Sequence, residues 1–506
     1  MRRGVISLLL CAALLLSLAG CGGGQDTGPD PQGGSSASGT DQEPTGKPVD
    51  IPFTLAAYPA YSFHPVLGGN RANLTLAPLL YEPLFQVDET FQAVPVLCQS
   101  VVSSEDKLSW TFTLRPGITF SDGTPLTGDI VAAALNAARQ TGSRYAQRLS
   151  AVSAITAGEG SVTVTLSRPN GSLPLLLDIP IASGTGERPA GTGPYVLSGT
   201  GEDLSLTART GWWQDKPLPA REIPLSAAVQ SDDLISSFAS GGIGLVDVDL
   251  MGTNSLGYSG SYETWDYATT DFLYLGFNTQ SGLCRSAQVR RALSKAVDRD
   301  SIIQVDYARH AVAASLPLHP ASSVYDLTLA QAARFDPDQM AGELEEAGAM
   351  GRPLVLLVNS ENPAKAAAAQ RIAYQLEAAG MEVTVSKLAF DDYTAALSQG
   401  SFDLYLGEVV LTADFDLSVL LSSGGGLNYG GWRDEPCDIL LSALRSAEGE
   451  DRRPAASALF AYLSEQAPIT PICFKNGSVL TQWGRLSGLA PVRGNVFYQL
   501  ENWIIQ

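Results

Sequence analysis

The clearest candidates for ligand chemistry are two aspartates, Asp414 and Asp416, in the stretch Val-Leu-Thr-Ala-Asp-Phe-Asp over 410–416. A carboxylate in a site that excludes water gains from a cationic partner, because charge-assisted hydrogen bonds are the strong ones. The alternative is a solvated loop acid or a cap for a helix over 417–421. The stretch therefore predicts that Asp414, and secondarily Asp416, binds a ligand.

A second candidate segment, Asn-Tyr-Gly-Gly-Trp over 428–432, follows a glycine-rich loop. Asn428 can hydrogen-bond the main chain of an extended ligand, and Trp432 can form an aromatic wall of the site. The alternative is a loop that Trp432 packs onto the surface of its own lobe. We therefore predict Asn428 and Trp432 as further ligand-binding residues.

Catalytic, metal and cofactor signatures fail on their context. The sequence has no GxSxG elbow, no phosphate-binding P-loop and no GxGxxG after a strand, and its three histidines form no HExxH. Residues 104–107 match SxxK and 475–477 loosely resemble KTG, but Ser104 falls in a turn instead of at a helix start. His64 in a loop remains the alternative metal ligand. We predict no catalytic residue, no metal and no cofactor.

The two aspartates follow a run of alternating strands and helices. Apolar patterning predicts strands over 354–358, 383–385 and 403–410. It predicts helices between them over 364–379, which ends at Gly380, and over 393–399. Helices between strands at this spacing indicate βαβ crossovers and a largely parallel sheet. Ligand sites of such sheets lie at the carboxyl ends of the strands, which is the place of Asp414.

Other elements are predicted from alternation and capping residues. Alternation over 108–120 predicts a β-hairpin with its turn at Pro116-Gly117, and 161–167 reads as a further strand. Helix starts are predicted at Thr127, at Ser286 and at Asp336-Pro337, the last helix ending at Gly348.

The first fifty residues read as an export and anchoring segment. Arg2 and Arg3 precede a short apolar run and Leu-Ala-Gly-Cys, which is typical of a signal peptide over 1–20. The ending resembles a bacterial lipobox, which implies lipidation of Cys21; an ordinary signal peptide with a chance cysteine is the alternative. Residues 21–50 are rich in Gly, Ser, Pro and Asp, so we expect a flexible tether.

The chain has 506 residues and a formal net charge of −20. Its length allows two to four domains. Nucleic-acid binding without sequence preference needs Lys and Arg, so we expect no nucleic-acid partner, whereas the acidic charge can favour cationic solutes in a cleft. Among the cysteines after Cys21, Cys437 and Cys473 are the first candidates for a disulfide, with no disulfide as the alternative.

Seven short motifs follow one another along most of the chain. They are Tyr81-Glu82-Pro83-Leu84, Trp110 to Gly117, Phe120 to Thr127, Gly191-Thr192-Gly193-Pro194-Tyr195, Gly276-Phe277-Asn278-Thr279, Arg290 to Asp298, and Ala467-Pro468-Ile469-Thr470-Pro471. In this order they resemble the signature of the extracellular solute-binding proteins of ABC importers, family 5, the peptide- and nickel-binding type. Most of these residues have turn or packing chemistry, so we expect them to hold the fold together.

The resemblance implies an α/β, two-lobed fold of the periplasmic-binding-protein type (type II with an accessory domain), closing on a ligand in a cleft. Lobe one would be discontinuous and consist of residues 51–87, 189–275 and 478–506. The accessory domain would span residues 88–188, and lobe two would span residues 276–477.

The resemblance also implies a function without bond chemistry. The protein would be a monomeric, extracytoplasmic, lipid-anchored receptor that captures a peptide and delivers it to an ABC permease with its ATPase subunits. Alternatives are a non-peptide solute such as a nickel chelate or haem, a peptide sensor without transport, and a secreted hydrolase.

The resemblance assigns one residue a role. The family's Ala-Asp-Tyr segment corresponds to 413–415, and its aspartate pairs with the α-ammonium of a bound peptide, a role that falls to Asp414. Leu411 stands where many relatives carry tryptophan, and Phe63-His64-Pro65 stands for their Leu-Asp-Pro. Both positions shape the pocket, so the ligand class stays open.

Overall fold

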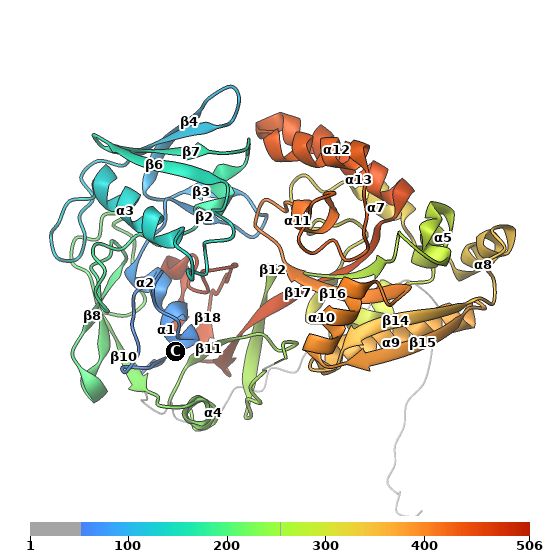
Figure 1. Ribbon diagram of the computed structural model, residues 1–506. Helices are drawn as coiled ribbons and strands as arrows, with labels where there is room; N and C mark the ends of the chain where they lie inside the picture. Colours follow the sequence, from blue (N-terminus) through green and yellow to red (C-terminus); the bar gives the residue numbers. More distant parts are fainter. Residues whose placement is uncertain (1–51, 254) are drawn as a thin grey trace, which may run out of the picture. The chain divides into compact units, whose positions relative to one another are not determined.

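The computed structural model describes residues 52–253 and 255–506 (Figure 1). The predicted signal peptide, Cys21 and the tether lie outside these residues. No helix in the described ranges combines the length and the apolar character needed to cross a membrane. The mixed α/β fold predicted from the sequence is confirmed.

The largest sheet, seven-stranded within the described residues, runs through the predicted lobe two and includes residues 245–248 and 262–275 of the predicted lobe one. The names of the lobes and of the accessory domain refer below to the predicted residue ranges. The strand order of this sheet is β11-β17-β12-β16-β14-β15, with β13 paired to β17. The strands are β11 (Leu245–Val248), β12 (Tyr262–Phe277), β13 (Ala311–Ala313), β14 (Pro353–Asn359), β15 (Glu382–Leu388), β16 (Leu404–Val410) and β17 (Ile469–Gln482).

The predicted βαβ run is present, but the sheet as a whole is not largely parallel. β14 is parallel to β15 and β16, and the crossovers are α9 (Pro363–Ala378) and α10 (Phe390–Gln399). β11, β12, β13, β16 and β17 pair antiparallel instead. The prediction missed this because these pairings join strands that lie far apart in the chain.

Two long strands cross the predicted boundaries between lobe one and lobe two. β12 has 16 residues and β17 has 14, and they stay paired from Tyr262 to Gly276 apart from two register shifts. Figure 1 shows both strands running from β11 toward the β14–β16 part of the sheet. The predicted boundaries at 275/276 and 477/478 therefore fall inside continuous strands.

Period-two alternation along β12 buries both faces of the sheet. Phe272 and Tyr274 pack into one core, and Leu273 and Leu275 pack into the other. The helices of lobe two cover these faces: α5 (Ala287–Lys295), α6 (Arg299–Ser301), α7 (Leu327–Ala332), α8 (Pro337–Glu346), α9, α10, α11 (Ser418–Leu421), α12 (Glu435–Ser446) and α13 (Arg452–Gln466).

The proposed Cys437–Cys473 disulfide is wrong. Cys437 packs in the core on one face of the sheet and Cys473 in the core on the other. All four cysteines of the described residues are buried and free. The sequence could not show this, because it depends on which face each element covers.

The accessory domain contains a four-stranded antiparallel sheet, β4-β5-β7-β6, with one helix. These elements are β4 (Cys98–Ser103), β5 (Ser109–Leu114), β6 (Val152–Gly158), β7 (Ser161–Leu166) and α3 (Gly128–Ala138). The hairpin predicted over 108–120 is wrong: β5 pairs with β4 and β7, and the chain after Pro116-Gly117 forms only an isolated bridge between Thr119 and Pro125.

Lobe one contains the sheet β1-β10-β9-β8 and several short elements. They are β1 (Leu55–Ala57), α1 (Arg71–Thr75), α2 (Ala77–Leu80), β2 (Phe85–Val87), β8 (Tyr195–Ser198), β9 (Ser205–Ala208), β10 (Glu222–Ala227), α4 (Ser231–Ala239), β18 (Leu486–Ser487) and β19 (Ile504–Ile505). β2 pairs with β3 (Ala93–Pro95), so the predicted boundary at 87/88 separates two paired strands.

The three predicted helix caps are confirmed, and one contact joins two of the seven motifs. Thr127, Ser286 and Asp336 each accept a hydrogen bond from a first-turn amide of α3, α5 and α8. The buried Arg290 guanidinium donates to the carbonyl oxygens of Gln466 and Ala467, which joins two of the seven motifs.

Candidate ligand-binding cavity

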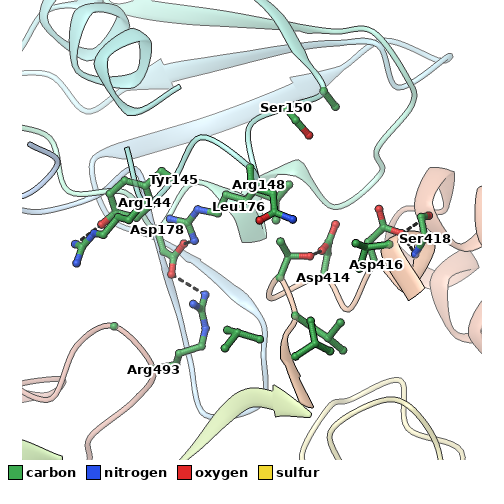
Figure 2. A pocket seen from close by; sticks show the side chains of 18 of the residues that line it. Arg144, Tyr145, Arg148, Ser150, Leu176, Asp178, Asp414, Asp416, Ser418 and Arg493 are labelled. Carbon is green, nitrogen blue, oxygen red and sulfur yellow. Dashed lines mark hydrogen bonds and ion pairs between the residues drawn. The ribbon is translucent and has the colours of Figure 1, made fainter. Parts of the chain in front are cut away.

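A cavity of about 1040 Å³ is lined by residues from all three predicted parts. It lies at the upper end of the roughly 300–1,000 Å³ typical of small-molecule sites. Lobe one contributes Arg71, the accessory domain Arg148 and Asp178, and lobe two Asp414 and Asp416. Figure 2 shows Asp414 and Asp416 on the opposite side of the cavity from Asp178 and Arg493.

The loop after β16 positions the two candidate aspartates. Thr270 holds its start, accepting at its carbonyl from the Leu411 amide (2.9 Å) and donating its hydroxyl to the Leu411 carbonyl (2.6 Å). Phe415 adopts the left-handed region with φ of 54°, which is unusual for a bulky residue. Its ring packs against Phe91 and Phe474, while the residues on either side of it line the cavity.

The Asp414 carboxylate is buried and accepts only neutral hydrogen bonds. The residue is 5% exposed, and its oxygens accept from Asn170 Nδ2 at 3.1 Å and Thr412 Oγ1 at 2.5 Å. The Arg452 guanidinium donates to the Asp414 carbonyl oxygen at 2.6 Å. No ion pair involves the Asp414 carboxylate within the described part of the chain. The site thus holds a desolvated negative charge without an ion-paired cation.

Asp416 also lines the cavity, but its carboxylate is used locally. One oxygen accepts from the Ser418 amide at 2.9 Å and the Ser418 hydroxyl at 2.5 Å, at the start of α11. The other lies 3.9 Å from the Arg168 guanidinium. Asp416 therefore binds the first amide of α11 from the position before its N-cap, Leu417.

Asn428 and Trp432 do not line this cavity. The Asn428 amide donates to the carbonyls of Ser422 and Trp432, and its oxygen accepts from the Trp432 amide at 2.9 Å. Trp432 is 9% exposed and packs in the core of lobe two, with its ring 5.4 Å from the Arg290 guanidinium. In this structure both residues therefore pack within their own part of the chain, as in the alternative to ligand binding given for this segment.

The His64 imidazole is engaged in its own loop. Nδ1 accepts from the amides of Val66 and Leu67, and Nε2 lies 3.3 Å from the Gly184 carbonyl oxygen. Burial lowers the pKa of His64. The described residues contain no cluster of three or more His, Cys, Asp or Glu side chains suited to a metal ion.

The SxxK match does not place serine and lysine together. Ser104 Oγ donates to Asp106 at 2.6 Å and accepts from the Ser109 amide, whereas Lys107 pairs with Glu448 at 2.5 Å. The Lys107 ammonium therefore does not serve as the base that an SxxK serine needs within hydrogen-bond reach.

The sequence analysis missed a group of arginines in the cavity wall. Asp178 accepts from Arg148 Nη1 at 2.6 Å and from Arg493 Nη2 at 2.8 Å. Burial raises the pKa of Asp178, but the two guanidinium groups outweigh burial and hold it below its usual value. These arginines lie in irregular segments, so no periodicity marked them.

The charge of the cavity differs from the charge of the chain. Five arginines and four aspartates line it, although the whole sequence carries −20. The expectation that the acidic charge of the chain favours cationic solutes in the cleft stays a prediction, because the lining itself contains one more arginine than aspartate. Each side of the cavity contains both signs of charge: Asp178 lies between Arg148 and Arg493 on one side, and Arg168 lies 3.9 Å from Asp416 on the other.

The accessory domain contacts lobe two beside the cavity. The Gly171 amide donates to the Arg445 carbonyl oxygen at 2.7 Å, and Arg452 donates to Ser172 Oγ. Asn170, which binds Asp414, belongs to the same segment. These contacts join the two sides that enclose the cavity.

A buried lysine lies where the two long strands pass between the lobes. Lys475 Nζ is 2.6 Å from Glu408, 2.8 Å from Asp271 and 3.3 Å from Asp249, and its side chain is 3% exposed. Burial and the neighbouring Glu408 carboxylate raise the pKa of Asp271 to about 7. The register shift of β12 between Ala268 and Asp271 lies at the same place.

Comparison with known proteins identifies the class that this fold and cavity represent. The family model of bacterial extracellular solute-binding proteins, family 5 (middle region), matches residues 92–429. The chain belongs to this family, as the seven motifs predicted.

Individual relatives differ in what their names say they bind. The chain is 26% identical over 297 residues to the nickel-binding periplasmic protein of Escherichia coli, covering 53% of this chain and 56% of that protein. It is 23% identical over 343 residues to a glutathione-binding protein of Salmonella typhi, covering 59% and 64%. The chain spans about half the length of the first curated relatives it matches.

A solved structure with the same fold is a periplasmic murein tripeptide-binding protein in its unliganded open form. It superposes with a TM-score of 0.75 at 19% identity and covers 90% of this chain and 97% of that one. At this identity the likeness shows the fold.

Proposed function

We propose that this protein is the extracytoplasmic solute-binding component of an ABC importer, and that it captures short peptides and delivers them to a membrane permease with its ATPase subunits. The observation that carries the proposal is the buried Asp414 carboxylate, which lines the cavity and forms no ion pair among the described residues; the nearby Arg452 guanidinium binds the Asp414 carbonyl oxygen instead. A ligand ammonium fits this position, because it would supply charge-assisted hydrogen bonds in a desolvated site.

Closure of the lobes would capture the ligand without making or breaking a covalent bond. A ligand held between Asp414 and the opposite wall contacts both sides of the cavity, and only such differential contacts shift a population toward the closed form. The glutathione- and tripeptide-binding relatives support a peptide-like ligand. The nickel-binding relative supports the second candidate, a metal chelate.

Mass spectrometry of solutes retained through purification tests the ligand class. We expect peptides with a free amino terminus. Recovery of metal chelates alone would replace the peptide proposal with the second candidate.

For Asp414→Asn, we expect about 10- to 100-fold weaker binding of a free-amine peptide, because a hydrogen bond to a charged group contributes about 1.5–3 kcal/mol. Calorimetric titration with the same peptide in its N-acetylated form provides the control, since that form carries no ammonium. Asp416→Asn is the matched variant and should lose less, because the Asp416 carboxylate already has a cation, the Arg168 guanidinium, at 3.9 Å. Equal losses for the free and acetylated peptides would show that Asp414 does not pair with the amine.

We further propose that Cys21 carries the lipid anchor that holds the protein at the outer face of the cell membrane. Cys21→Ser should move the protein from the membrane fraction to the soluble fraction of expressing cells, because the acyl chains supply the membrane affinity. Unchanged fractionation of the variant would contradict lipidation at this residue.

A further inference from the structure

The turn between β2 and β3 inserts a phenylalanine into the core of lobe two. Phe91 is 6% exposed, whereas the other residues of the turn, 88–90 and 92, are partly or fully exposed. The centre of its ring lies 4.9 Å from that of Phe415 and 4.9 Å from that of His319. Phe91 belongs to the accessory domain and the two other rings belong to lobe two. The accessory domain therefore supplies an aromatic side chain to a core of lobe two.

Hydrogen bonds within the turn fix the position of this ring. One carboxylate oxygen of Asp88 accepts from the amides of Thr90 and Gln92, at 2.9 and 2.8 Å, and from the Thr90 hydroxyl at 2.9 Å. The Phe91 amide donates to the Asp88 carbonyl oxygen at 3.1 Å. Phe91 has a φ of 58°, in the left-handed region that a bulky residue adopts only where its surroundings hold it. The turn thus presents the ring in one defined direction.

In lobe two, the Phe91 ring packs against the residue that follows Asp414. Phe415 is buried and also has a positive φ, 54°. Its ring makes edge contacts with Phe91 and with Phe474 of β17, at interplanar angles of 71° and 89°, a favoured geometry for aromatic pairs. Because packing must hold a bulky residue in this backbone conformation, loss of the Phe91 ring would release Phe415 and the carboxylate beside it.

The fourth ring of this group, His319, is buried and neutral. Its Nδ1 accepts from the Ala321 amide at 3.1 Å, and its ring centre lies 5.2 Å from that of Phe474. Burial lowers the pKa of His319 to about 4, so the ring carries no charge at neutral pH. The four rings therefore form an uncharged aromatic group, and Phe91 is the member that comes from the accessory domain.

We infer that Phe91 is a positioning residue for ligand binding: its ring, inserted from the accessory domain, holds Phe415 in the left-handed conformation and so sets the direction of the Asp414 carboxylate. This rests on the proposed function, in which Asp414 pairs with a ligand ammonium. Asn170, also in the accessory domain, donates to the same carboxylate. Withdrawal of the accessory domain would remove the ring and the amide together, so Asp414 is oriented only while this domain contacts lobe two.

Calorimetric titration with trialanine and with N-acetyl-trialanine tests this role. On the wild-type protein the free amine should bind about 10- to 100-fold more tightly than the acetylated peptide, as expected for charge-assisted hydrogen bonds. On Phe91→Ala the two peptides should bind within about threefold of each other, because Asp414 is no longer held toward the ammonium. A loss of general stability alone would weaken both peptides alike and leave the preference unchanged.

Two further variants and one measurement without ligand complete the test. Val94→Ala is the matched control, since it truncates an apolar side chain of the same hairpin that is 37% exposed, and it should retain the wild-type preference. Phe91→Leu guards against misfolding of the alanine variant; it keeps an apolar side chain without the ring and should show an intermediate preference. Small-angle scattering without peptide should give a larger radius of gyration for Phe91→Ala than for the wild-type protein, because the buried ring no longer joins the accessory domain to lobe two.

An undiminished preference for the free amine in Phe91→Ala would overturn the positioning role, as would an undiminished preference in Phe91→Leu where the alanine variant does not fold. If the wild-type protein itself shows no preference or binds neither peptide, the pairing of Asp414 with a ligand ammonium fails, and scattering alone decides on Phe91. A larger radius for Phe91→Ala would then still support its hold on the Asp414 loop, and an unchanged radius would reject it.

Discussion

Replacing Lys475 with methionine is expected to lower the free energy of unfolding by about 3–5 kcal/mol, the usual cost of removing one partner from a buried ion pair. The ammonium is buried and lies within 3.3 Å of three carboxylates, those of Asp249, Asp271 and Glu408. Methionine approximates the unbranched stem of lysine and leaves these carboxylates without their cation. Chemical denaturation of the purified variant measures the loss.

The loss should grow with pH. Asp271 already has its pKa raised to about 7, chiefly by burial and by Glu408, and the positive charge of Lys475 opposes that rise. Without the lysine the folded-state pKa rises further, so the folded variant binds more protons than the unfolded chain from about pH 4 upward. Stability of the variant therefore falls as pH rises through this window, and its deficit should be larger at pH 8 than at pH 5.

Lys295→Met is the matched control for this prediction. Lys295 pairs with Glu343 on a partly exposed part of lobe two, with side-chain exposures of 24% and 27%. Pairs exposed to solvent contribute about 0–1 kcal/mol, so this variant should lose little and show no added pH dependence. A loss at Lys475 no larger than at Lys295 would show that the carboxylates relax into solvent.

Gly171→Val is expected to weaken ligand binding by about 10- to 100-fold. A Cβ atom on Gly171 would lie 2.2 Å from the Ala447 carbonyl oxygen and 2.6 Å from that of Ser446, both backbone atoms of lobe two. The accessory domain would have to withdraw, which breaks the Gly171–Arg445 hydrogen bond and the Asn170 contact with Asp414. Two lost hydrogen bonds at about 0.5–1.5 kcal/mol each correspond to this change in affinity.

Small-angle scattering with saturating ligand should show that Gly171→Val stays more extended than the wild-type protein. Gly186→Val is the control, because a Cβ atom there meets nothing within 4 Å and its backbone has no positive φ. It should close and bind as the wild-type protein does. Equal affinity and equal compaction in the two variants would mean that the contact at Gly171 does not contribute to closure.

Local patterns in the sequence predicted the elements well. Thr127, Ser286 and Asp336 begin helices because their side chains accept from first-turn amides, which depends only on neighbouring residues. The βαβ run over 353–410 is visible because strand and helix periodicities alternate within a short stretch. The place of Asp414 after the last of these strands follows from the same run.

Pairings between distant strands could not be predicted in this way. The hairpin over 108–120 fails because β5 finds its partners in β4 and β7 and not in the segment after its own turn. Contacts of Gly407 and Gly477 could not be predicted either. They face the rings of Tyr274 and Tyr267 on β12, and the residues near these glycines in the sequence do not indicate an aromatic neighbour.

The sequence by itself determined the family, the order of the elements and the aspartate that ends the βαβ run, because those features are written in short motifs and local periodicity. Only the tertiary structure decided which residues contact that aspartate. Asn170 lies 244 positions from Asp414, and Arg493 lies 315 positions from Asp178, yet each pair is in hydrogen-bond contact. The packing of the lobes and the accessory domain brings these charged side chains together, so a chain with a net charge of −20 encloses a cavity lined by five arginines and four aspartates.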